Sequence, residues 1–268
     1  MHHAPGLNVW RDRVSVQCEV KNVLESGMEA VFRRFDEKYI RYLRTYLTEV
    51  LYNIKLHSPA FSVKKANRAQ IAGWLRESPQ GTAIAAASIE GARSVLAFLR
   101  EERLTGRADA KTGRWSEDAR AFNGVFLCPA GECPVRYERV ILWDAPAAAF
   151  PGLPAGELYE PDERVSCGWL RELPDVNRLR ELFVLVRGLT KSGALLRSSA
   201  ADIDAELSRA AGGSWIEAMA SLAALRSMGL IGAEKERLYM LPSHKTDPMN
   251  DVTFRKIQLL RDHAIGKG

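Results

Sequence analysis

The stretch RVILWDAP, residues 139–146, carries the pattern that decides the fold of this chain. Its apolar run ends in an acid, Asp144, and Pro146 follows two residues later. A continuous apolar run of this length is typical of a strand buried on both faces, as in parallel sheets covered by helices. Ligands of open α/β sheets gather at the carboxyl ends of the strands, so Asp144 is the first candidate for a metal-binding or proton-handling residue.

The segments around this run repeat the same alternation. Residues 81–88, 124–130 and 137–144 are predicted as strands, and residues 66–78 and 89–103 as helices. The sequence RLTGRADAKTGRWSED at 103–118 reads as a polar loop, and residues 145–168 as an irregular connection rich in Ala, Pro and Gly. Helices that alternate with apolar strands indicate a small, Rossmann-like α/β domain with a parallel sheet over residues 59–168.

The turns of this domain carry little chemistry. The turn after the first apolar strand, Ser88-Ile89-Glu90-Gly91, has one glycine and no lysine, so no phosphate-binding loop is predicted. Asp144 has no visible acidic or histidine partner, and we expect it to cap the turn made with Pro146. Cys128 and Cys133 lack a second ligand pair, which favours packed or surface thiols over zinc. We expect no catalytic residue, metal site or cofactor within this chain.

The N-terminal quarter changes its periodicity at Gly27. Residues 7–23 alternate apolar and polar side chains, which predicts a half-buried strand that needs partners and could belong to a partial β domain over residues 1–26. Aromatic and aliphatic residues then recur at spacings of three and four. This spacing predicts one long amphipathic helix at about 28–55, acting as a linker over residues 27–58.

The last hundred residues, 169–268, read as a separate helical module. Three helical segments are followed by a predicted β-hairpin at 230–242, which is the order of a winged helix. Ser214 and Glu217 form a capping box at the start of the third helix. Glu217 and Arg226 are the charges of that helix, a poor set for reading duplex DNA, so a protein-docking or spacer role stays open beside DNA binding.

Charge is concentrated in the first quarter of a chain that is otherwise of ordinary soluble composition. The 268 residues are 46% hydrophobic and 26% charged with a net charge of +5, and residues 1–68 hold 12 Lys and Arg against 7 Asp and Glu. The sequence has no apolar run long enough to span a membrane and no signal-peptide pattern, so we expect a cytoplasmic protein. Basic residues interleaved with Phe and Tyr suit single-stranded DNA, although buried aromatics and solvated charges explain the same pattern. The candidate DNA-binding residues are Arg33, Arg34, Lys38, Arg41, Arg44, Lys64, Lys65, Arg68, Lys235 and Arg237.

The order of these segments resembles the C-terminal region of the bacterial single-stranded-DNA-specific exonuclease RecJ, in its long, Firmicutes-like form. The strand at 7–23 is similar to the closing strands of that family's OB-fold, through Asn8, Trp10, Val16, Gln17 and Val20. RVILWDAP and the segments 173–189, 221–231 and 245–260 resemble its later modules. The family's catalysis uses Mn or Mg in an upstream core of aspartates and histidines. The resemblance therefore implies a noncatalytic part of a longer exonuclease, and no catalytic residue is carried over.

Three functions remain open from the sequence. The first is the noncatalytic C-terminal part of a RecJ-like 5′ to 3′ exonuclease of DNA recombination and repair, contacting single-stranded DNA or a repair-protein partner. The second is a stand-alone winged-helix DNA-binding regulator with an α/β sensor domain. The third is a metal-dependent nuclease in its own right.

Overall fold

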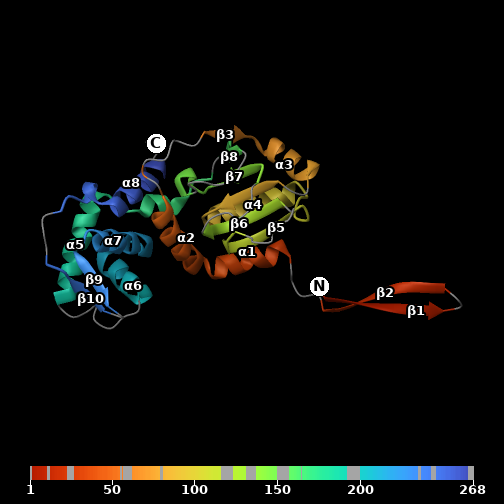
Figure 1. Ribbon diagram of the computed structural model, residues 1–268, viewed down its shortest axis with the longest axis horizontal. Coiled ribbons are helices and arrows are strands. Elements are labelled where there is room, and N and C mark those ends of the chain that lie inside the picture. Colours follow the sequence, from red (N-terminus) through yellow and green to blue (C-terminus); the bar gives the residue numbers. More distant parts are fainter. Residues whose placement is uncertain are drawn as a thin grey trace.

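The fold was examined in a computed structural model, which describes most of the chain. Figure 1 shows a central sheet flanked by helices, a helical bundle beside it, and an N-terminal hairpin that projects from the rest. The described residues are 2–10, 13–22, 27–54, 56, 62–78, 81–115, 123–130, 137–149, 157–163, 165–191, 200–234, 237–242 and 246–264.

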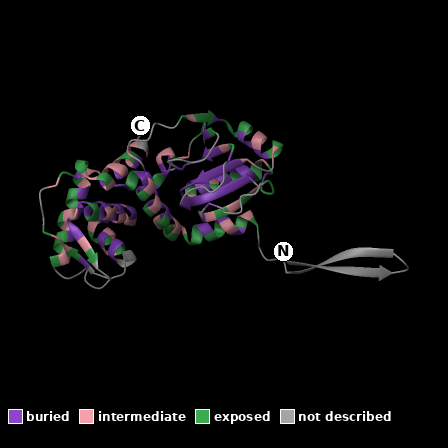
Figure 2. Cartoon of the chain, viewed as in Figure 1, coloured by how far each residue is buried: buried purple, intermediate pink, exposed green. Residues whose placement is uncertain are grey.

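The centre of the molecule is a six-stranded parallel sheet, so the expected α/β class is confirmed. Its strand order is β3-β8-β7-β4-β6-β5, and every neighbouring pair is parallel. The strands β4 and β6 are buried along their whole length, as the purple colour in Figure 2 shows, because helices cover both faces of the sheet. The strands are β3 (Val63–Ala66), β4 (Thr82–Ala86), β5 (Ala108–Arg114), β6 (Asn123–Ala130), β7 (Arg139–Leu142) and β8 (Glu157–Pro161).

Half of these strands were not predicted from the sequence. The edge strand β5 lies inside the segment expected to be a polar loop, and β8 lies inside the expected irregular connection. The opposite edge strand, β3, is only four residues long and carries Lys64 and Lys65. Edge strands need no continuous apolar run, because one side of them faces solvent, and short polar edges also discourage aggregation.

Four helices pack around the sheet: α1 (Met28–Glu37), α2 (Tyr39–Asn53), α3 (Arg68–Glu77) and α4 (Ile89–Glu101). Two of them, α3 and α4, have side-chain N-caps. Asn67 and Gln70 form a reciprocal capping box at the start of α3. The single helix expected at 28–55 is instead two helices, with a break at Lys38 where φ is −119° and ψ is 18°.

The break at Lys38 lets both helices pack against the sheet instead of acting as a linker. Helix α1 contacts β5 and α4, whereas α2 contacts β5, β6 and the C-terminal helix α8 (Val252–Ala264). Phe35, at the end of α1, stacks on Tyr42 of α2 with ring centroids 5.9 Å apart. Leu43, Tyr46 and Leu47 of α2 are fully buried. The aromatic stripe is therefore core, which was the simpler of the two interpretations.

The C-terminal module contains the three helices and the hairpin that the sequence predicted. These elements are α5 (Val176–Lys191), α6 (Ala200–Ala211), α7 (Trp215–Ser227), β9 (Ile231–Glu234) and β10 (Arg237–Met240). Short 3₁₀ helices lie in the connections: η1 (Ala147–Ala149) follows β7, η2 (Gly168–Glu172) precedes α5, and η3 (Pro248–Asn250) precedes α8. Ser214 caps α7 by accepting a hydrogen bond from the Glu217 N–H, which is one half of the predicted capping box. The Glu217 carboxylate binds Arg178 instead of completing the other half.

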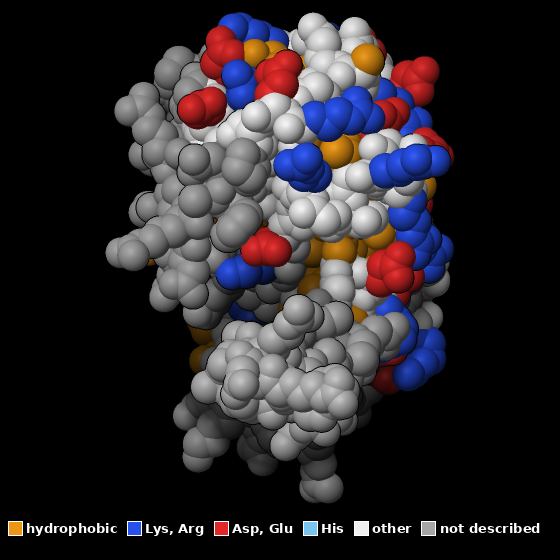
Figure 3. Space-filling view, turned by 90° about the vertical axis from the view of Figure 1, so that its right-hand side faces the viewer, with side chains coloured by type: hydrophobic (Ala, Val, Ile, Leu, Met, Phe, Trp, Pro, Cys, Tyr) orange, Lys and Arg blue, Asp and Glu red, His pale blue; other side chains and the backbone are white. Residues whose placement is uncertain are grey.

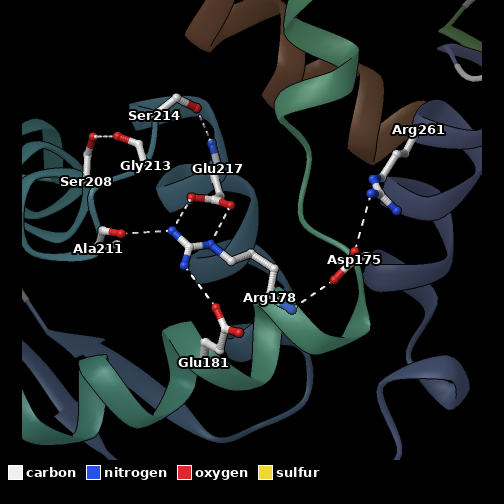
Figure 4. A network of polar contacts seen from close by, with 9 residues as sticks. All are labelled: Asp175, Arg178, Glu181, Ser208, Ala211, Gly213, Ser214, Glu217 and Arg261. Atoms are coloured by element: carbon white, nitrogen blue, oxygen red, sulfur yellow. Dashed lines mark hydrogen bonds and ion pairs between the residues drawn. The ribbon is translucent and has the colours of Figure 1, made fainter.

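A polar network around Arg178 holds this module together (Figure 4). The Arg178 guanidinium donates to both carboxylate oxygens of Glu217, at 2.8 and 3.0 Å, to Glu181, and to the carbonyl of Ala211. Through these bonds α5 is joined to α7 and to the end of α6. Bidentate Arg–carboxylate pairs of this kind fix geometry as well as contributing energy.

The N-terminal strand predicted at 7–23 pairs with the residues that precede it. Strands β1 (His2–Trp10) and β2 (Arg13–Asn22) form an antiparallel hairpin. Within the described part of the chain this is a two-stranded sheet of its own. Whether it is the end of an OB-fold stays a prediction.

Candidate functional site: the carboxyl edge of the sheet and the basic face of α1 and α2

The sheet has a switch point between β4 and β7, where a ligand crevice is expected. The chain leaves β4 toward β5 on one side of the sheet and leaves β7 toward β8 on the other side. Adjacent strands whose connections diverge in this way open a crevice at their carboxyl ends in doubly wound folds. Asp144 follows β7 and Ser88 follows β4, so both residues lie at this edge.

Asp144 fills the position that a bound anion would occupy at the start of α4. Its Oδ1 accepts a hydrogen bond from the Ala87 N–H at 2.6 Å, and its Oδ2 accepts one from the Ser88 hydroxyl at 2.5 Å. The Ser88 oxygen in turn accepts from the Gly91 N–H at 2.9 Å, which caps α4. A side chain of the protein thus occupies the usual anion site of a strand–helix turn.

The prediction that Asp144 caps the turn it makes with Pro146 was therefore wrong. Its side chain binds the turn between β4 and α4, 57 residues away, instead of the turn it makes with Pro146. Gly91 permits this approach because it has no side chain. A Cβ at this position would lie 2.2 Å from Oδ2 of Asp144, which is a steric clash. Burial raises the pKa of the Asp144 carboxyl to about 6, against the opposing effect of its hydrogen bonds.

The remainder of this crevice is filled by side chains from α2, β6 and η2. The Trp169 indole N–H donates to the Ala87 carbonyl at 3.0 Å, and the Cys128 thiol donates to the same oxygen at 3.4 Å. Tyr46 packs edge-on against Trp169 with ring centroids 6.1 Å apart. Asp144, Trp169, Cys128 and Tyr46 are at most 3% exposed.

The buried groups at this edge are poorly suited to nucleophilic or metal chemistry. Burial, reinforced by the charge of Asp144, raises the pKa of the Cys128 thiol well above its usual value, which disfavours the reactive thiolate. Across the described residues, no group of three or more His, Cys, Asp or Glu side chains is arranged to hold a metal ion. Cys133, the possible partner of Cys128 in a zinc site, lies outside the described residues.

The ten candidate DNA-binding residues do not form one surface. Arg44 pairs with the buried carboxylate of Asp204 on α6, at 2.5 Å, and lies over the Trp215 ring. Lys64 and Lys65 on β3 pair with Glu157 and Glu160, and Arg68 pairs with Glu101 of α4 at 2.8 Å. Arg33 lies 4.0 Å from Glu37. Lys235 and the side chain of Arg237 lie outside the described residues.

Many other surface cations are also paired. Arg76 binds Glu102, Arg93 binds Asp36, and Arg100 binds Glu29. In Figure 3, the face on the side of α3 and the N-terminal hairpin shows basic and acidic side chains interspersed. Interspersed charges of both signs produce little attraction for a polyanion.

Arg34, Lys38 and Arg41 remain as exposed cations of α1 and α2 without an ion pair to another described residue. Arg34 lies in the last turn of α1, Lys38 lies at the break, and Arg41 lies in the first turn of α2, so the three cations surround the junction of the two helices. From Arg41, exposed Thr45 and Thr48 and then Tyr52 follow along α2 at helical spacings of four, three and four, and Tyr52 is 82% exposed. We call these six residues the α1–α2 row. Sequence reasoning missed Tyr52, which lies outside the predicted apolar stripe, although its spacing from Arg41 was visible.

A groove opens beside the Arg34 end of this row. It has a volume of about 770 Å³ and lies between the first turns of α1 and the edge strand β5. Arg34 and Lys111 line it together with Asp109 and the small side chains of Ala108 and Ala110. The row and the groove therefore adjoin at Arg34.

Helix α7, the third helix of the C-terminal module, is buried on nearly every side. Ile216, Ala220, Leu222 and Leu225 are at most 4% exposed, and α5, α6, α8 and η2 all pack against the helix. A recognition helix needs one whole face free to enter a major groove. The burial of α7 prevents such insertion in this arrangement.

No protein-family model, no curated protein and no solved structure matches this chain. Among the described residues, the helices are too short or too polar to cross a membrane.

Proposed function

We propose that this chain is a noncatalytic single-stranded-DNA-contacting part of a RecJ-like exonuclease, and that the α1–α2 row makes the contact. The observation behind the proposal is that Arg34, Lys38 and Arg41 are exposed around the α1–α2 junction and make no ion pair with any residue that the structure describes. Their charges are available to phosphates, whereas most other cations of the sheet domain are neutralised by neighbouring acids.

The rest of the row has the residue types that a single strand requires. Tyr52 offers an exposed aromatic ring for base stacking, which favours single strands because duplex bases are already stacked. Thr45 and Thr48 separate the ring from the cations and hydrogen-bond to backbone carbonyls of their own helix, at 3.2 and 2.9 Å. The groove beside Arg34 has room for an unstacked nucleotide.

The noncatalytic character is supported by the closed carboxyl edge. If the chain were a metal-dependent nuclease, Asp144 would be the candidate catalytic acid. Its side chain is fully buried and hydrogen-bonded to the Ala87–Ser88 turn. The recombination and repair context comes from the resemblance of residues 7–23, 139–146 and the C-terminal segments to RecJ. In this proposal the C-terminal module is a winged-helix-like spacer or docking module, because buried α7 disfavours the alternative of a duplex-reading regulator.

Fluorescence anisotropy with labelled oligothymidine tests the proposal. Three phosphate contacts to a single strand give a slope of log K against log salt of about −2, which is a loss of about twentyfold between 50 and 200 mM salt. The variant R34A/K38A/R41A is expected to lose this salt-dependent binding. Tyr52→Ala is expected to weaken binding about tenfold with the slope unchanged, because stacking is not ionic.

The matched control is R180A/R187A/K191A on α5, which also removes two arginines and one lysine, from exposed positions outside the α1–α2 row. It should bind DNA as the unmodified chain does. Equal losses in the two triple variants would mean that net charge alone drives binding, and a tighter complex with duplex than with single strands would contradict the proposal.

A further inference from the structure

The outer face of α5 lies beside an apolar pocket in the C-terminal module. The pocket has a volume of about 150 Å³. Leu179 and Phe183 of α5 line it on one side, and Leu225, Met228 and Pro248 line it on the other. An apolar cavity of about this size holds one benzene molecule, so the pocket suits a single large apolar side chain.

Three cations lie along one exposed face of α5, and the first of them, Arg180, lines the pocket. Arg180, Val184, Arg187 and Lys191 follow the helical spacings i, i+4, i+7 and i+11, and all four are exposed. The three cations make no ion pair with any residue that the structure describes, and Arg180 also lines the pocket. Val184, between the cations, is 68% exposed. This face extends over about 16 Å of helix.

Gly188 adds a second unusual feature to this face. It lies in the interior of α5, one turn after Val184, where glycine is less favourable than alanine. A Cβ at Gly188 would meet nothing within 4 Å, so packing inside the module does not require a glycine there. The absent side chain leaves room for another backbone to approach the helix closely. We call Arg180, Val184, Arg187, Gly188 and Lys191 the α5 row.

We propose that the α5 row and the adjoining pocket bind an acidic amphipathic helix of a partner protein, which inserts one large apolar side chain into the pocket. Carboxylates of the partner helix, spaced by one and two turns, complement the three cations. The apolar side chain would lie beside Val184, and the partner backbone would pass over Gly188. This inference does not depend on DNA binding by the α1–α2 row.

The chemistry of the face favours a protein over a nucleic acid. Arg180 and Thr246 are the polar residues among those that line the pocket, so a nucleobase buried there would leave hydrogen-bonding groups unsatisfied. The exposed Val184 between two arginines likewise offers nothing to a phosphate. A helix with one apolar and one acidic face matches both features at once.

Anisotropy of fluorescein-labelled 18-residue peptides on the full chain tests this site. The probes are helical peptides with glutamates at spacings of four and three and one Phe, Leu or Trp on the same face. Saturable binding is expected for at least one of them. Replacing its glutamates by glutamine, or its large apolar residue by alanine, should weaken binding about tenfold or more.

Variants of the chain locate the complex. R180A/R187A/K191A and Gly188→Leu are each expected to weaken peptide binding about tenfold, the first by removing charge and the second by blocking close approach. Gly188→Leu should leave the thermal unfolding temperature unchanged or higher, since open space surrounds that position. R34A/K38A/R41A, which removes as much charge from the α1–α2 row, should change the peptide Kd less than twofold.

Three results would overturn the inference: no saturable binding by any of the acidic peptides, unchanged binding to Gly188→Leu, or equal losses in the two triple variants. Displacement of the peptide by oligothymidine in the α1–α2 triple variant would also overturn it, because the α5 row would then be a DNA site. The same variants keep the two proposals apart, since each row serves as the charge-matched control of the other.

Discussion

Protonation of Asp144 should stabilise the folded protein, in contrast to most carboxyl groups at helix N-termini. The carboxyl is fully buried, and burial raises its pKa to about 6 from an ordinary value near 3.8. The folded state therefore binds more protons than the unfolded state between about pH 4 and 6. Stability from this group is gained as the pH falls through 6 and is lost as the pH rises.

The magnitude follows from the two pKa values. A difference of about 2 pKa units means that the ionised carboxyl destabilises the folded state by about 3 kcal/mol at neutral pH. About 2 kcal/mol of this loss of stability is recovered when the pH falls from 7.5 to 4.5. Asp144→Asn removes the titration while keeping an oxygen for the Ala87 N–H. The free energy of unfolding of the unmodified chain, minus that of Asp144→Asn, should therefore rise by about 2 kcal/mol on acidification over this range.

Urea unfolding at the two pH values, followed by tryptophan fluorescence, measures this difference. Trp143 and Trp169 are both buried at the edge of the sheet and report on its unfolding. A difference that is independent of pH would show that Asp144 has an ordinary pKa. A difference that falls on acidification would show that the helix dipole and hydrogen bonds dominate over burial, which refutes the reasoning.

Three further substitutions test the packing that the structure shows. Gly91→Ala should destabilise the protein by about 2 kcal/mol, because its Cβ would lie 2.2 Å from Asp144, and adding Asp144→Ala should relieve part of that loss in a double-mutant cycle. Arg44→Ala should cost about 2 kcal/mol at pH 8 by leaving buried Asp204 unpaired. The cost should fall as the pH is lowered, because burial raises the pKa of that carboxyl, and chemical unfolding at two pH values measures this difference. Arg178→Ala should lower the thermal unfolding temperature of the C-terminal module through loss of its bidentate bond, as differential scanning calorimetry would show.

The sequence predicted those parts of the fold whose signals are local. The apolar strands β4, β6 and β7, the helices α3 and α4, and the order of the C-terminal elements all follow from periodicity and turn residues within short segments. The break between α1 and α2 was missed, because the apolar spacing continues across Lys38 without a proline or glycine. The polar edge strand β5 was missed, because it is held by backbone pairing with β6 and its own side chains show no apolar run.

The candidate site was harder to predict, because its contacts are long-range. Asp144 meets Ala87 and Ser88 across two adjacent strands, and no local pattern shows that 57 residues separate the partners. The same holds for Arg44, which the sequence presents as a free cation and the structure pairs with Asp204, 160 positions along the chain. Charge counted along a sequence overestimates the charge available to a ligand.

Photocrosslinking of the full chain to oligothymidine that carries 5-iodouridine tests the central claim most directly. Peptide mapping by mass spectrometry should find the crosslinked base on Tyr52, the exposed ring of the α1–α2 row, and the crosslink should be lost at high salt. Crosslinks confined to the C-terminal module, or crosslinks that persist in R34A/K38A/R41A, would contradict the account.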